Sequence, residues 1–144
     1  MPIPVQVRHA AVDARTLLST LWIFATLNYL YCDVLGLMDP KLLPGYLAGN
    51  VQGIQIDQGF LLSAGVLVEI PIAMVLLARV LPYGANRWAN IAAATVMTAV
   101  QVATLFVGSL SAYYAFFSAL EIGCTAFILW YAARWRDARP IRTA

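Results

Sequence analysis

Charged residues are scarce in this sequence. Only 11% of its 144 residues are Asp, Glu, Lys or Arg, whereas 62% are hydrophobic, and the mean hydropathy is +0.77. Because a soluble domain carries about 25% charged residues, this composition indicates a membrane protein. The formal net charge of +2 is too small to point to nucleic acid, so no nucleic-acid partner is predicted.

Residues suited to metal and redox chemistry are also few. The sequence has one histidine, His9, and two cysteines, Cys32 and Cys124, which lie in apolar stretches without a CxxC pair. Buried free thiols are therefore the simplest interpretation of the cysteines. There is no nucleotide-binding loop, HExxH motif or serine nucleophile elbow. We predict no metal site and no cofactor.

Long apolar stretches dominate the rest of the chain. Four of them are long enough as helices to cross a hydrocarbon core of ~30 Å, at about residues 17–38, 59–81, 88–108 and 112–134. We expect one all-α integral membrane domain over residues 1–144, an up-down bundle of four transmembrane helices. Residues 82–87 are predicted to form a tight turn. The longest loop, 39–58, either carries a short helix around Tyr46 that covers the helix ends or is a plain connector.

The arginines predict the orientation in the membrane. Both tails and the connection between the second and third stretches together hold eight arginines, while Lys41 is the one basic residue on the other side. By the positive-inside rule both termini are cytoplasmic. The protein is then a multi-pass protein of the cell membrane, inner or plasma, with the lipid bilayer as its surroundings.

Two carboxylates lie deep inside the apolar stretches. Glu69 is at the middle of the second stretch, two residues before Pro71, and Glu121 is at the middle of the fourth. An acid at such depth costs roughly 2.5–3.5 kcal/mol on insertion scales, so it normally faces protein or water. Glu121 shares a helical face with Tyr114 and Ser118, and Gln101 lies on a stripe of small and polar residues in the third stretch.

Depth along the helices suggests that these polar groups meet. We predict one intramembrane layer containing Glu69, Glu121, Gln101, Asn28 and Tyr29, with Asp33 closer to the outer surface. No Lys, Arg or His lies at that depth, so at least one of the two glutamates should hold a proton at neutral pH. The candidate ligand-binding residues are Glu69, Glu121, Gln101, Asn28, Tyr29, Asp33 and Tyr114.

Four segments of the chain are distinctive: WIFATLNYLYCDVLGLMDP, VEIPIAMVLLARVLP, NRWANI and YYAFFSALEIGCTAFILWYAARW. Together they resemble a family of small bacterial four-span membrane proteins known only as a domain of unknown function, over about residues 16–135. The resemblance implies the fold and the membrane location but no activity. More loosely, the bundle is similar in fold to DoxX-like and emopamil-binding-like proteins. Its acids do not align with theirs, and it has no intramembrane histidine.

Three functions remain open at this point. The first is a binding or catalytic site for a small, mostly apolar molecule such as a lipid, a quinone or a sterol- or isoprenoid-like compound. It would be lined by the acids and by aromatic residues, namely Trp22, Tyr29, Tyr113, Tyr114 and Phe117. The second is a proton-coupled transporter, which with so few spans would act as a homo-oligomer. The third is a non-enzymatic accessory or structural subunit whose polar stripes are packing faces.

Overall fold

The computed structural model of the protein describes residues 13–107 and 110–136. The elements in chain order are α1 (Ala14–Met38), α2 (Leu43–Leu47), β1 (Asn50–Val51), β2 (Ile54–Gln55), α3 (Gln58–Val80), α4 (Tyr83–Thr104) and α5 (Ala112–Arg134). The two strands pair antiparallel as a small hairpin. Everything else that is regular in the described part is helical, which confirms the predicted all-α class.

Three of the long helices, α1, α3 and α5, have the length and apolar composition needed to cross a membrane. Helix α4 has 22 residues but is more polar than these three. It begins at Tyr83, so the predicted turn over 82–87 is wrong. Pro82 stands at the N-cap with φ −64°, and its carbonyl accepts the backbone N–H of Asn86 at 2.9 Å, so the helix starts directly after the proline. Gly108, the predicted end of this span, lies outside the described residues.

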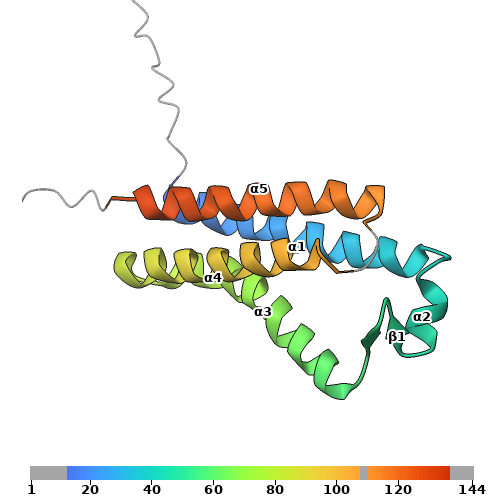
Figure 1. Cartoon of the computed structure of the whole chain (residues 1–144). Helices are drawn as coiled ribbons and strands as arrows, with labels where there is room; N and C mark the ends of the chain where they lie inside the picture. The colour runs from blue at the N-terminus through green and yellow to red at the C-terminus, as the bar shows by residue number, and fades with distance from the viewer. Residues whose placement is uncertain (1–12, 108–109, 137–144) are drawn as a thin grey trace, which may run out of the picture.

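The four long helices pack as a ring in which α1 contacts α3 and α5, while α4 contacts α5 and α3. Successive long helices run in opposite directions (Figure 1). The start of α1 and the end of α5 therefore lie at one end of the molecule, here called the tail end. Helix α2 and the hairpin lie at the other, here called the cap end (Figure 1).

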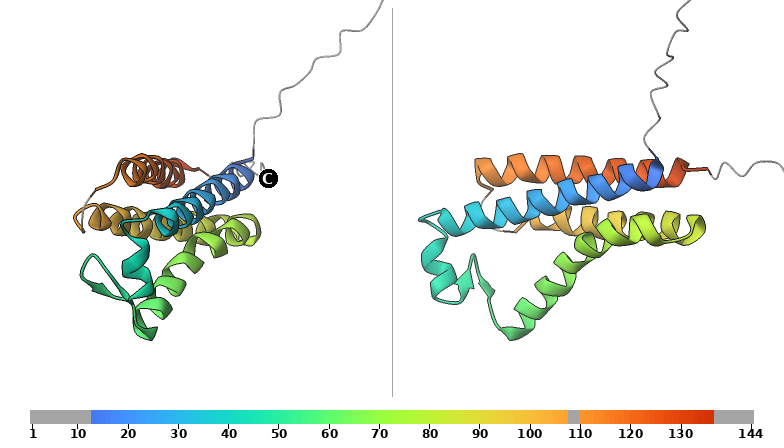
Figure 2. Two further views of the ribbon diagram at one scale, coloured as in Figure 1. Left: turned by 90° about the vertical axis from the view of Figure 1, so that its right-hand side faces the viewer. Right: turned by 180° about the vertical axis from the view of Figure 1, so that it is seen from behind.

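Helix α3 bends where the sequence places a proline. Its buried residues, Pro71, Met74 and Ala78, all belong to its C-terminal half, which runs beside α4 (Figure 2). The N-terminal half swings away from the other helices toward the hairpin (Figure 1). Pro71 cannot donate a backbone N–H to the carbonyl of Leu67, and this missing bond favours a kink there.

The core follows the stripes seen in the sequence. The buried residues of α4 include Asn90, Ala94, Met97 and Gln101, and those of α5 include Ser118, Glu121 and Thr125. On both helices they recur at steps of three and four residues, which confirms that the polar stripes face the bundle. The side chains bond across the interface, with Thr98 Oγ1 2.8 Å from Thr125 Oγ1.

A buried polar network joins three helices near the tail end. Trp22 Nε1 of α1 donates to Asn90 Oδ1 of α4 at 2.7 Å, and Asn90 Nδ2 donates to Asn86 Oδ1 at 2.7 Å. Asn86 Nδ2 in turn donates to the carbonyl of Ala78 in the last turn of α3 at 2.6 Å. Last-turn carbonyls have no partner within their own helix, so the Asn86 amide supplies the missing donor.

Arg87 does the same for α5. Its guanidinium donates to the carbonyls of Ala132 and Ala133 at 3.2 and 2.8 Å. The tail end is therefore held together by side chains that cap the C-termini of α3 and α5.

Candidate functional site

The connection between α1 and α3 folds into a cap, here defined as residues 39–57. It contains the short helix α2 and the hairpin, so of the two alternatives for this loop the short helix around Tyr46 is the one observed. The hairpin packs closely on α2, because a Cβ added at Gly45 would lie 2.7 Å from the carbonyl oxygen of Asn50. Contacts as short as this require glycine at that position.

A cavity of about 490 Å³ lies between this cap and the ends of the long helices. Its walls come from the end of α1, from the cap and from the connection between α4 and α5. Its lining includes apolar side chains, namely Leu42, Val51, Ile54, Val107 and Leu110. It also includes polar or aromatic ones, namely Cys32, Asp33, Asp39, Lys41, Tyr46, Gln52, Thr104, Ser111, Tyr113 and Tyr114.

Two phenols meet over a glycine in this cavity. A Cβ built on Gly36 of α1 would lie 3.5 Å from Tyr113 Oη and 3.6 Å from Tyr46 Oη. Burial raises the pKa of the Tyr46 phenol, and nearby Asp33 and then Tyr113 raise it further. Tyr46 therefore keeps its proton and contributes a neutral hydroxyl to the lining of the cavity.

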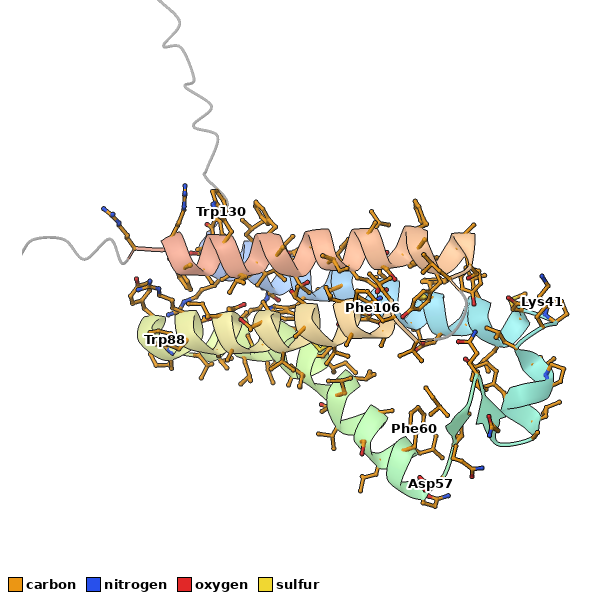
Figure 3. All side chains as sticks on the ribbon, in the orientation of Figure 1. Lys41, Asp57, Phe60, Trp88, Phe106 and Trp130 are labelled. Carbon is orange, nitrogen blue, oxygen red and sulfur yellow. The ribbon has the colours of Figure 1, made fainter. Side chains whose placement is uncertain are left out.

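Three charged side chains line the cavity, and one of them, Asp39, accepts a hydrogen bond within the described residues. Asp39 Oδ1 accepts the backbone N–H of Lys41 at 2.9 Å and so belongs to the turn that begins the cap. Lys41 lies at the outer tip of the cap end (Figure 3). In the described part of the chain, neither Asp33 nor Lys41 makes a side-chain hydrogen bond or an ion pair. Asp33 is thus a free carboxylate in the wall of the cavity.

Four of the predicted layer residues are buried or half-buried. Glu121 is 1% exposed, and its Oε1 atom and Tyr29 Oη are buried without a hydrogen-bond partner in the described residues. The two side chains are close enough to interact electrostatically. Gln101 Nε2 donates to Ser118 Oγ at 2.8 Å, whereas Asn28 Nδ2 donates to Phe24 O in its own helix.

Glu69 does not join that layer. It is exposed, and it makes no hydrogen bond or ion pair with any described residue. Two residues along a helix turn it by about 200°, so Glu69 faces away from the side on which Pro71 is buried. The prediction compared depth along each helix and left out the face, and this is why it grouped Glu69 with Glu121.

The structure thus divides the candidate residues into three places. Asp33 and Tyr114 line the cavity, and Glu69 is on the outside of α3. The other four, Glu121, Gln101, Asn28 and Tyr29, are buried or half-buried. Trp22, also expected to line a site, is fully buried against Asn90. Gly36 is not among the candidate residues predicted from the sequence. Its position four residues after Cys32, on the same face of α1, could have indicated that the two residues line one site.

Comparison with known families places the chain. The model of a family of unknown function, DUF6326, matches residues 7–141. The chain belongs to the DUF6326 family. In this DUF6326 protein the match takes in the cap, all four long helices and every candidate residue named above. No curated protein and no solved structure matches the chain.

Proposed function

We propose that this DUF6326 protein is a multi-pass protein of the cell membrane that binds a small, mostly apolar molecule beneath its cap. The observation that carries the proposal is the cavity of about 490 Å³. Ligand sites in proteins have volumes of roughly 300–1,000 Å³, with mostly apolar walls and a few convergent polar groups. The lining of this cavity, with its apolar side chains beside Asp33 and two phenols over Gly36, has that character.

The proposed membrane arrangement has four spans, with α4 as the third. The more polar α4 is suited to this role because its amides bond inside the helix ring, as Asn90 and Gln101 do. Trp88 and Trp130, both largely exposed, lie toward the tail end (Figure 3), where interfacial tryptophans are expected. The described arginines flank that end of the helices, which supports a cytoplasmic tail end and a cap on the opposite side.

The cavity walls support an amphiphilic ligand, such as a lipid, a quinone or a sterol- or isoprenoid-like compound. Its apolar part would lie along Leu42, Val107 and Leu110, and its polar part would meet Asp33 and the phenols. A fold likeness to DoxX-like and emopamil-binding-like bundles is part of this proposal. It is supported by the ring of four helices.

Mass spectrometry of organic extracts from the purified protein tests this function. Gly36→Leu places a side chain where Tyr46 and Tyr113 meet, so the variant should lose a molecule that co-purifies with the wild-type protein. Gly84→Leu is the matched control, since nothing lies within 4 Å of a Cβ at Gly84. Equal extracts from wild type and Gly36→Leu, or no reproducible molecule in either, would contradict the proposal.

Glu69 favours a second candidate, an accessory subunit that packs its α3 against another membrane protein or a second copy of itself. The outward face of α3 combines this acid, which has no partner among the described residues, with exposed Leu62, Ile72 and Leu76, at 71, 44 and 64% exposure. An acid facing lipid is unfavourable, so a covering surface would stabilise it. Native mass spectrometry in mild detergent tests this, because Glu69→Leu should change the assembly. An unchanged monomer in wild type and variant would exclude it.

A further inference from the structure

One carboxylate in the lining of the cavity, Asp33, has no hydrogen-bond or ionic partner among the described residues. The other acid of the lining, Asp39, already accepts a backbone N–H in its turn. Any ligand that closes this cavity displaces water from Asp33, and this is strongly unfavourable unless the ligand supplies a donor or a positive charge.

Aromatic rings surround the same space. Tyr46 from the cap and Tyr113 and Tyr114 from the start of α5 all line the cavity, and the hydroxyl groups of the first two both lie close to Gly36. Gly36 follows Asp33 by three residues, which places the glycine and the carboxylate on neighbouring turns of one helical face. A carboxylate beside several aromatic rings is the environment in which proteins bind alkylammonium groups.

The charged side chains of the lining together favour a positively charged ligand. Two acids, Asp33 and Asp39, oppose one base, Lys41, and the base lies at the outer tip (Figure 3). An anionic head would meet the free carboxylate directly. A neutral head with a hydroxyl or amide N–H group can donate to that carboxylate, but it leaves the negative charge uncompensated in the closed cavity. A cationic head pairs with Asp33 and contacts the tyrosine rings at the same time.

We infer that the cavity takes the cationic head of an amphiphile, an alkylammonium or quaternary ammonium group, with Asp33 as its counter-ion and Tyr46, Tyr113 and Tyr114 as the rings around it. This inference rests on the proposed binding function and narrows it to one ligand class. The alkyl part of the amphiphile lies along the apolar wall made by Val51, Ile54, Val107 and Leu110.

Titration calorimetry on the full chain in a non-ionic detergent tests the inference with three probes that share one alkyl tail: hexyltrimethylammonium, hexan-1-ol and hexane-1-sulfonate. The wild-type protein should bind the ammonium at least about tenfold more tightly than the alcohol, and the sulfonate most weakly. Asp33→Asn should remove most of the preference for the ammonium and leave the affinity for the alcohol unchanged. The retained alcohol binding then shows that the variant is folded.

Substitutions at two further positions test whether the Asp33 charge and the Tyr46 ring act locally, rather than through the overall charge of the cap end. Asp57→Asn removes the same charge from the cap end outside the cavity and keeps the N-cap of α3, so the ammonium preference should persist. Tyr46→Phe keeps the ring and should keep most of the affinity, whereas Tyr46→Leu should weaken ammonium binding severalfold.

The outcomes distinguish the inference from the proposed function. Equal affinity for the ammonium and the alcohol, unchanged in Asp33→Asn, would overturn the cationic head while leaving an apolar binding site in place. An equal loss of preference in Asp57→Asn would also overturn it, because bulk charge would then be the cause. Failure of all three probes to bind would overturn the inference, and together with an empty organic extract it would overturn the proposed function as well.

Discussion

The hydrogen bonds of the Asn86 side chain allow a specific prediction about the stability of an Asn86→Leu variant. Replacing Asn86 with Leu removes the donor that reaches the Ala78 carbonyl at 2.6 Å in a fully buried position. It also removes the acceptor that Asn90 Nδ2 uses at 2.7 Å, although that amide keeps the Asn86 carbonyl at 2.9 Å as a second partner. One buried carbonyl is therefore left without a donor, and one side-chain bond is lost.

The expected cost follows from these two changes. An unsatisfied buried acceptor costs about 1–3 kcal/mol, and the lost side-chain bond, which lies within α4, contributes about 0.5–1.5 kcal/mol. Asn86→Leu should therefore lower the free energy of unfolding by about 1.5–4.5 kcal/mol. The matched control is Asn28→Leu, because the Asn28 amide bonds only the Phe24 carbonyl of its own helix. That carbonyl keeps its backbone partner, so the control should change stability by less than about 1 kcal/mol.

Unfolding of both variants in mixed micelles, followed by circular dichroism as denaturing detergent is added, measures the difference. The reasoning requires Asn86→Leu to unfold at clearly lower detergent than Asn28→Leu. If the two variants unfold together within about 0.5 kcal/mol, the Ala78 carbonyl must find another donor, and the capping argument for the tail end is wrong.

The remaining predictions address the cap, the core and the outer face. Gly45→Ala should open the cap, because its Cβ would meet the Asn50 carbonyl at 2.7 Å, and hydrogen exchange over residues 43–55 should speed up. Gly84→Ala, in open space on α4, should instead stabilise the protein by about 0.5–1 kcal/mol in thermal unfolding. Trp22→Phe should lose at least about 1–3 kcal/mol, because the buried Asn90 oxygen no longer receives the indole N–H and the smaller ring leaves a cavity, and an unchanged midpoint would contradict this. Glu69→Leu should leave detergent stability unchanged or raised, and a loss above about 1 kcal/mol would show that this carboxylate has a partner.

The sequence by itself determined the helical class, the long apolar helices and the faces that two of them bury. These follow from composition and from the 3.6-residue period, which are local properties of the chain. Residues such as Gln101 and Glu121 were predictable as inward-facing because small or polar neighbours recur on their side of the helix. The start of α4 was not, because Pro82 and Gly84 suggest a turn until the proline is seen at the N-cap.

Only the tertiary structure decided which polar groups meet. Glu69 and Glu121 lie at similar depths in their helices. However, α3 packs against the bundle through the side that carries Pro71, so Glu69 faces outward. Counting residues from the end of a helix gives depth but does not show which side of the helix packs against its neighbours. The cavity is also a tertiary feature, since Asp33, Tyr46 and Tyr113 come from three separate segments. Their meeting depends on a cap whose packing requires a glycine at position 45, and such packing is set by contacts between segments rather than by local sequence.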